Sequence, residues 1–326
     1  MPVKNAAPFL NECLDSILNQ SYKKWELIAI NDHSTDESGK ILKSYAEKSP
    51  QIKMYPNKGK GIISALKNAY TYSSGEYIHR MDADDIMVKD KLQMLYADLK
   101  SKGKGFVSTG MVKYFSKKGV NKGYLNYEKW LNQLCINQKH WDEIYKECVI
   151  ASPNWLIHRD DLEDCGAFNQ QQYPEDYDLV FRFYQHQFKV SAVQKVLHLW
   201  RDHPKRSSRN LPQYKNNDFF ALKWQYYKSI ERDENRPLMI WGAGRKGKKM
   251  ARLLQKKKIK FEWVSNNPNK YGKEIYDQIL RSFKRTIQLD NPQIIIAVSQ
   301  IGAKKEITSF LRNNGLKTKR DFTFFC

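Results

Sequence analysis

Strand-like apolar runs alternate with helix-like segments through residues 1–81, and this order restricts the fold more than any other feature of the sequence. Residues 8–20 carry apolar side chains at helical spacing, and residues 25–30 (WELIAI) form a short apolar run typical of a strand. The segments QIKMYPN, GIISALKNAYTYSS and EYIHRM then read as strand, helix and strand. This alternation predicts an α/β fold with a mainly parallel sheet that is covered on both faces.

A second strand–helix–strand series begins at PLMIWGAG, which predicts a second α/β domain. The 326 residues and the 41% hydrophobic content suffice for two packed cores. We therefore expect a first domain over residues 1–212, a linking helix over 213–236, and a small, basic, Rossmann-like domain over 237–326. No apolar stretch approaches the ~20 residues of a membrane-spanning helix, and the first residues lack the pattern of a signal peptide, so we expect a cytoplasmic protein. The five scattered cysteines form no C-x-x-C pair, which predicts reduced thiols.

The second domain contains G-x-G-x-x-G, at Gly242–Gly247, after a predicted strand and before a predicted helix. This pattern binds dinucleotides when an acidic residue ends the next strand. Here Ser265 stands at that place and Glu262 lies earlier in the strand. An NAD-dependent sugar-modifying enzyme is therefore an alternative that lacks one of its expected residues, although Arg245 and Lys246 could hold a phosphate.

Positive charge is concentrated in the last third of the chain. The sequence has 56 Lys and Arg against 35 Asp and Glu, a formal net charge of +21, and residues 237–326 hold 20 of these cations against 6 acids. Such a surface attracts nucleic acid, anionic lipid headgroups or a charged polysaccharide, and it is equally consistent with a solvated surface that has no partner. A basic nucleic-acid-binding protein is a further alternative, but its aromatic residues form no recognisable stacking motif.

Three carboxylates follow the predicted strand EYIHRM, within the segment MDADD. Ligands of open α/β sheets bind outside the carboxyl ends of the strands, where Asp82 and Asp84 are expected to lie. Carboxylates this close together suit a hard divalent cation such as Mg²⁺ or Mn²⁺. The structural alternative is an acidic turn that caps the helix starting near Lys89.

A second acidic cluster, Glu175, Asp176 and Asp178, opens another predicted helix. Acidic residues also favour helix N-termini for electrostatic reasons alone, which is the structural alternative here. Further along, WRDHPKRSSR groups Arg201 and His203 with two more arginines. This grouping suits an anion, or else a solvated basic loop.

These segments, taken in order, resemble the family 2 glycosyltransferases of the GT-A fold. The resemblance rests on MPVKNAAPFLNECLDSILNQSYKKWELIAINDHSTDES, NKGKGIISALKNAYTYSSGEYIHRMDADD, EDYDLVFR and the Arg-x-His segment, and it covers about residues 1–212. The last part of the chain resembles the Rossmann-like domain appended to some bacterial members. The resemblance implies sugar transfer from a nucleotide-diphosphate donor, with inversion and a divalent metal, Mn²⁺ or Mg²⁺.

The resemblance also implies roles for single residues. Asp32 would accept a hydrogen bond from the nucleobase, beside the Pro2–Val3 edge, and Lys67 would lie near the diphosphate. An aspartate suits the N3–H donor of uracil, so a UDP-sugar is favoured. Asp82 and Asp84 would hold the ribose and the metal.

The remaining roles belong to the later motifs. Asp176 matches the proposed general base, with Glu175 beside it, and His203 matches a histidine near the metal or diphosphate. Arg201 is expected at the donor, and Asp85 is an accessory candidate. The implied acceptor is a cell-envelope glycan or a lipid-linked saccharide at the inner face of the cytoplasmic membrane, where the basic domain would contact the anionic surface.

The sequence departs from the family pattern at its start. Members have several apolar residues before M-P-V, so we expect a shortened first strand and altered contacts to the donor base. Asn31 and His33 replace an Asp and a Gly of the family's turn. The transferred sugar, the acceptor and the linkage have no readable signature.

Overall fold

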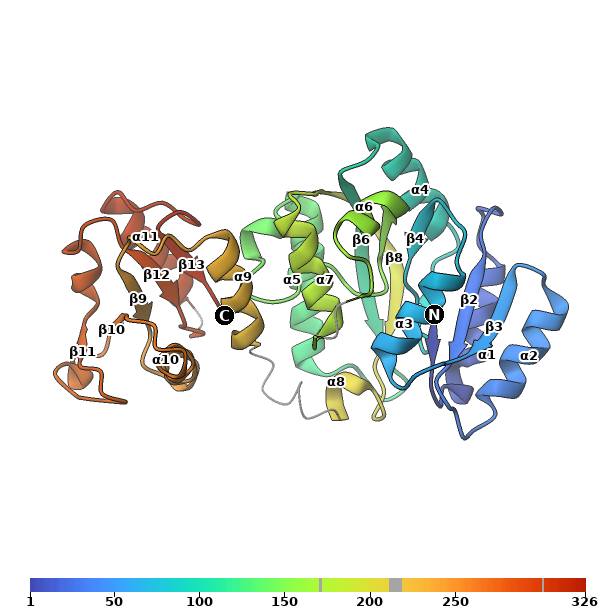
Figure 1. Cartoon of the computed structure of the whole chain (residues 1–326), viewed down its shortest axis with the longest axis horizontal. Coiled ribbons are helices and arrows are strands. Elements are labelled where there is room, and N and C mark those ends of the chain that lie inside the picture. The colour runs from blue at the N-terminus through green and yellow to red at the C-terminus, as the bar shows by residue number, and fades with distance from the viewer. Residues whose placement is uncertain (170–171, 211–218, 301) are drawn as a thin grey trace. The chain divides into compact units, whose positions relative to one another are not determined.

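The computed structural model describes residues 1–169, 172–210, 219–300 and 302–326 (Figure 1). One compact unit comprises Met1–Trp141 and Val149–Lys215, and a second comprises Asp142–Cys148 and Asn216–Cys326. The predicted boundary between residues 212 and 213 lies outside the described residues. Helix α9 (Phe220–Ile230) falls within the predicted linking segment and groups with the second unit. The three-part division stays a prediction.

The first unit begins with a parallel sheet. Strands β1 (Pro2–Val3), β2 (Leu27–Asn31) and β3 (Ile52–Pro56) pair in the order β1-β2-β3. Parallel neighbours need crossover connections, which the helices α1 (Ala7–Leu18) and α2 (Ser38–Lys48) supply, and α3 (Ile62–Tyr72) follows β3. The predicted alternation of strands and helices is confirmed over these residues.

The second sheet of this unit is mixed, and here the expectation of a mainly parallel sheet is wrong. Its order is β4-β7-β6-β8-β5, and only β6 and β8 pair in parallel. The strands are β4 (Tyr77–His79), β5 (Ile86–Met87), β6 (Phe106–Phe115), β7 (Trp155–His158) and β8 (Lys189–Arg201). The helices around them are α4 (Lys91–Lys102), α5 (Lys122–Asn137), α6 (Arg159–Asp164), α7 (Glu175–Gln185) and α8 (Ser207–Asn210).

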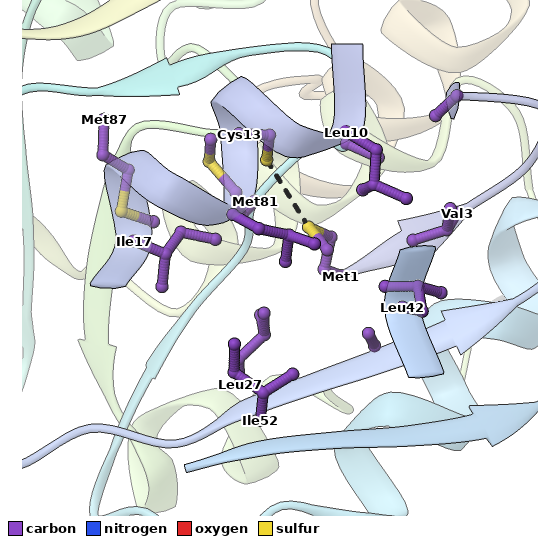
Figure 2. Packing of buried hydrophobic residues seen from close by; sticks show 14 residues of the cluster. Met1, Val3, Leu10, Cys13, Ile17, Leu27, Leu42, Ile52, Met81 and Met87 are labelled. Atoms are coloured by element: carbon purple, nitrogen blue, oxygen red, sulfur yellow. Dashed lines mark hydrogen bonds between the residues drawn. The ribbon is translucent and has the colours of Figure 1, made fainter. Parts of the chain in front are cut away.

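An apolar core fixes the position of the acidic turn that follows β4. Met81 and Met87, on either side of the turn, are 2% and 5% exposed, and both belong to the cluster drawn in Figure 2. Cys13 of α1 lies in the same cluster and its thiol approaches the carbonyl oxygen of Asp82 at 3.6 Å. Burying both methionines leaves the carboxylates between them at the edge of this core. All five cysteines are free, as predicted.

The second unit contains a sheet of five parallel strands in the order β11-β10-β9-β12-β13. The strands are β9 (Leu238–Trp241), β10 (Glu262–Ser265), β11 (Leu280–Ser282), β12 (Gln293–Ile296) and β13 (Phe322–Phe324). Helices α10 (Arg245–Lys256) and α11 (Ala303–Asn313) lie on opposite sides of these strands in Figure 1. Short 3₁₀ turns span His140–Glu143, Pro268–Lys270 and Phe283–Ile287.

The glycine-rich loop of the second unit joins β9 to α10, and its backbone packs tightly against the first turn of that helix. Gly242 has φ +126°, a backbone conformation that side chains rarely adopt. A Cβ atom on Gly247 would lie 1.8 Å from the carbonyl oxygen of Gly242, so the helix and the loop can pack this closely only with glycine there. Glu262, the acid nearest to the expected place, pairs with Arg285 at 2.9 Å.

Candidate active site

The turn after β4 directs its three carboxylates to three different partners. Asp82 accepts a hydrogen bond from Nε of Arg80 at 3.2 Å, and Asp84 Oδ2 lies 2.8 Å from Nε2 of His203. Asp85 is 1% exposed and faces β8, where it accepts the backbone N–H of Arg201 at 2.8 Å. The structure thus brings two predicted metal ligands, Asp84 and His203, into contact across 119 positions of sequence.

The capping alternative for this turn is wrong. Helix α4 begins at Lys91, the side chain of its N-cap residue Asp90 makes no capping hydrogen bond, and the backbone N–H of Leu92 donates to Gln20 at 3.0 Å. The carboxylates of the MDADD segment make the contacts given above instead.

The Asp84 carboxylate is suited to hold a cation. Burial raises the pKa of Asp84, but the hydrogen bond from His203 and the charge of Arg206 outweigh it, so the pKa lies below its usual value. Within the described residues, no three His, Cys, Asp or Glu side chains surround one point. Two protein ligands with additional oxygens from a diphosphate would still fit Mg²⁺ or Mn²⁺, which commonly keep several non-protein ligands.

The segment that carries His203 is held by aromatic side chains. The His203 ring packs on Phe9 of α1 with centroids 4.5 Å apart. Arg206 places its guanidinium carbon 4.7 Å from the centre of the Trp200 ring and 5.2 Å from that of Tyr114. Cation–π contacts of this kind are worth about 0.5–2 kcal/mol each, so they stabilise the position of the histidine.

The second acidic cluster divides into a site residue and a structural one. Glu175 accepts a hydrogen bond from Arg80 at 3.1 Å, and among the described atoms its second oxygen, Oε2, is buried and without a partner. Asp178 instead pairs with Arg182 within α7 at 3.0 Å, so the structural alternative holds for that residue. Arg80 therefore joins the turn after β4 to the beginning of α7.

Both candidate base residues have raised pKa values. Burial raises the pKa of Glu175 to about 7, although the charge of Arg80 opposes the shift. Burial also raises the pKa of Asp176, again against Arg80. Asp176 accepts the backbone N–H of Tyr177 at 2.8 Å. Acids whose pKa values approach neutrality are suited to proton transfer.

The predicted nucleobase contact, Asp32, is already hydrogen-bonded within the protein. Asp32 follows β2, and its backbone N–H donates to the carbonyl of Val3 at 2.7 Å. Its carboxylate accepts from Asn57 at 2.7 Å and from the backbone of Gly61 at 3.0 Å. Burial raises the pKa of Asp32, but these hydrogen bonds and Lys4 bring it below its usual value, so the group is an ionised acceptor.

Lys67 and Arg201, the two basic residues predicted at the donor, differ in their surroundings. Lys67 is exposed on α3, and its ammonium has no ion pair among the described residues. Arg201 is 6% exposed and donates to Glu12 at 2.5 Å and to the carbonyl of Asp84 at 2.7 Å. The guanidinium of Arg201 thus serves internal contacts that hold the turn, which local sequence spacing could not reveal.

Sequence reasoning missed Arg80, Asn57, Lys91 and His198. Arg80 had a readable signal, since an arginine at the end of an apolar strand needs a carboxylate partner. Asn57 follows β3 as Asp32 follows β2, so the carboxyl ends of parallel strands could have pointed to it. Lys91 and His198 contact each other over a sequence separation of 107 and carry no local signal.

Comparison with known proteins identifies the first unit. Residues 1–166 match the family model described as Glycosyl transferase family 2. The chain belongs to glycosyl transferase family 2. The matched residues contain strands β1 to β7 and the acidic turn.

The relatives of this glycosyltransferase include bacterial proteins of several kinds. "Glycosyltransferase GlyG" of Streptococcus pneumoniae is 25% identical over 207 residues, which cover 62% of this chain and 69% of GlyG. "Putative glycosyltransferase EpsE" of Bacillus subtilis is 39% identical, over 34% of this chain and 41% of EpsE. "Chondroitin synthase" of Pasteurella multocida is 25% identical, over 68% of this chain and 22% of that protein. The chain thus spans less than half the length of the last two.

A solved structure confirms the fold. TarS residues 1–349 of S. aureus, in complex with UDP, has a TM-score of 0.53 and 18% identity, covering 72% of this chain and 66% of TarS. The predicted α/β fold, with its GT-A-like arrangement, is therefore confirmed.

Proposed function

We propose that this family 2 glycosyltransferase moves a sugar, with inversion, from a UDP-sugar to a hydroxyl group of a cell-envelope glycan or lipid-linked saccharide. The observation that carries the proposal is the contact between Asp84 and His203, two side chains that would hold Mn²⁺ or Mg²⁺. The bound metal would neutralise charge on the departing diphosphate.

Side chains of the protein would carry out the proton transfer and orient the donor base. Asp176 would take the proton of the acceptor hydroxyl while its oxygen attacks C1 of the sugar. The bond from C1 to the diphosphate oxygen breaks as the new bond forms, and its electron pair leaves with UDP. One such displacement inverts the anomeric centre. Asp32, with Pro2 and Val3 at its side, would orient the uracil through its ionised carboxylate, which shares its acceptor oxygens with Asn57 and Gly61.

The proposal extends to a location at the cytoplasmic face of the membrane, through the outer face of α10. Residues 245–260 contain nine Lys and Arg and no acid. Met250, Ala251 and Leu254 are buried against the sheet, whereas Lys248, Arg252 and Lys256 are exposed. No helix within the described residues has the length and apolar character to cross a bilayer. Each cation near an anionic lipid surface contributes about 1 kcal/mol, so this face supports peripheral binding.

Calorimetry with UDP tests the proposed reaction class. UDP should bind the wild type only with Mn²⁺ or Mg²⁺, and Asp84→Asn should abolish this binding. Asp160→Asn is a matched control, because Asp160 is half-exposed and pairs with Lys104 away from the turn. If UDP does not bind under any metal condition, the UDP-sugar proposal is wrong. Binding of NAD in a parallel titration would instead favour the alternative based on Gly242–Gly247.

A further inference from the structure

A chain of buried polar side chains lies behind the acidic turn and takes no part in the proposed reaction. Lys91 is the first residue of α4, His198 belongs to β8, and Asp85 is the third carboxylate of the turn. Lys91 and His198 are 0% exposed, and Asp85 is 1% exposed. Burying an amine and a carboxyl group so completely is costly unless each has partners, so their contacts need a reason.

The contacts form one continuous chain. Nζ of Lys91 donates to the carbonyl of Pro153 at 2.6 Å and lies 3.0 Å from Nδ1 of His198. Nε2 of His198 lies 3.0 Å from Oδ2 of Asp85. A lysine ammonium can only donate, so Nδ1 of His198 accepts and Nε2 carries the proton that it shares with Asp85. The imidazole of His198 thus connects the buried amine of Lys91 to the buried carboxyl group of Asp85.

The same chain continues to the proposed metal ligands. Oδ1 of Asp85 accepts the backbone N–H of Arg201 at 2.8 Å, and Nε of Arg201 donates to the carbonyl of Asp84 at 2.7 Å. His203 follows two residues later and meets the Asp84 carboxylate at 2.8 Å. Asp85 therefore connects the turn to the end of β8, and this connection fixes the positions of Asp84 and His203.

We propose that Lys91 and His198 are positioning residues which, through Asp85, hold Asp84 and His203 in the geometry that binds the metal. The inference rests on the proposed function for the identity of the metal site. Neither residue contacts Asp84 or His203 directly in the series of hydrogen bonds given above. Their effect is to fix the orientation of the carboxylate that does.

Charge balance gives the proposal a specific test by double-mutant cycle. Lys91→Met leaves the Asp85 carboxylate buried without its cation, and Asp85→Asn leaves the Lys91 ammonium without its anion. The double variant removes both charges. If the two residues act through the same series of contacts, the loss of Mn²⁺ affinity in the double variant is smaller than the product of the losses in the two single variants.

The experiment measures Mn²⁺ affinity of the full chain by electron paramagnetic resonance, without and with UDP, and thermal unfolding in parallel. Lys91→Met and His198→Gln should each weaken Mn²⁺ binding about 10- to 100-fold. The affinity lost in Lys91→Met with Asp85→Asn should be smaller than the product of the two single losses. Asp161→Asn serves as the control, because Asp161 is a buried carboxylate that accepts the N–H of Gly105 at 2.7 Å, outside this chain of contacts. It should lower stability and leave Mn²⁺ affinity unchanged.

Each outcome decides between the two proposals. Folded Lys91→Met or His198→Gln with wild-type Mn²⁺ affinity would overturn the positioning role, as would strictly additive losses in the cycle. If Lys91→Met does not fold, His198→Gln, which retains a donor for Asp85, carries the test. If the wild type binds Mn²⁺ but not UDP, the UDP-sugar proposal is wrong, and the double-mutant cycle still tests the positioning role through Mn²⁺ affinity. Wild type that binds neither would overturn both.

Discussion

Arg80 donates one hydrogen bond to Glu175 at 3.1 Å and another to Asp82 at 3.2 Å, so a single guanidinium joins the acidic turn to α7. Arg80 is 6% exposed, and Glu175 lies 95 positions away in the sequence. The donor side and the proposed base side of the site are therefore mechanically coupled through one cation. This coupling leads to the first prediction.

Replacing Arg80 with Met should destabilise the protein in a pH-dependent way. Removing one partner of a buried ion pair typically costs about 3–5 kcal/mol. The pKa of Glu175 is about 7, so at pH 5 this carboxyl group is already protonated and needs no counter-charge. Urea unfolding of wild type and Arg80→Met should show a larger difference at pH 8 than at pH 5. Equal losses at both pH values would contradict the pairing with Glu175.

Glu175→Gln should stabilise the protein more at high pH than at low pH. The folded-state pKa of Glu175 is raised from 4.5 to about 7, chiefly by burial, so the folded state holds a proton that the unfolded state has released between these values. This group therefore lowers stability as pH rises through that window. Relative to wild type, Glu175→Gln should gain about 3 kcal/mol between pH 4.5 and pH 8. The free energy of unfolding across that range checks it, and a constant difference would refute the assignment.

Asp176→Asn should abolish turnover while leaving donor binding intact. A general base contributes about 10²- to 10⁴-fold to a rate, because it removes the proton in the transition state. We expect kcat to fall by that factor while the metal-dependent affinity for UDP stays within about twofold of wild type. Steady-state kinetics with a responsive UDP-sugar, paired with calorimetry, separates the two effects. A comparable loss of UDP affinity would place Asp176 at the donor instead.

Reversing charges on α10 should release the protein from anionic vesicles. Lys248→Glu and Lys256→Glu on α10, with Lys257→Glu at its exposed C-cap, should together weaken binding to phosphatidylglycerol-rich vesicles by about 100-fold or more, at about 1 kcal/mol per lost cation. The matched control carries three Lys→Glu substitutions, at Lys117, Lys118 and Lys122, which are exposed in the first unit. Co-sedimentation measures both. Equal losses in the two variants, or α10-dependent binding to duplex DNA but not to vesicles, would rule out the membrane contact.

Gly247→Ala should destabilise the second unit far more than Gly244→Ala. An added methyl group at Gly247 would meet the carbonyl oxygen of Gly242 at 1.8 Å, whereas nothing lies within 4 Å of the same atom at Gly244. Overpacking of this kind costs about 1–3 kcal/mol or more. Thermal unfolding should show a clear loss for the first variant and a small change for the second. Similar melting temperatures would contradict this packing of loop and helix.

The sequence predicted the first sheet because its strands and helices are local, periodic and joined in order. The order of β6, β7 and β8 within their sheet has no local sequence signal, because their antiparallel and parallel pairings join residues far apart in the chain. β4 has only three residues, so its apolar run revealed the strand but not its partner β7. Helix α2 begins at Ser38, whose backbone N–H donates to the Asp36 carboxylate at 3.0 Å.

The candidate site was predicted in part for the same reason. The contact between Asp84 and His203 followed from resemblance, because no periodicity connects the two residues. Arg201 is predicted at the donor from its positive charge, and in the structure its guanidinium contacts Glu12 and the carbonyl of Asp84. Charge indicates that a partner exists, but packing decides whether the partner is a substrate or the protein itself.

The pairing of β5 with β8 fixes the acidic turn relative to the histidine segment. Ile86 lies opposite Leu199 and Met87 opposite His198, so the acidic turn and the histidine segment are aligned by two adjacent strands. A one-residue slip would turn His198 to the other face of the sheet. Insertions in the connections between β5 and β8 leave that alignment untouched. Loops between these two strands can therefore change in length without separating Asp84 from His203.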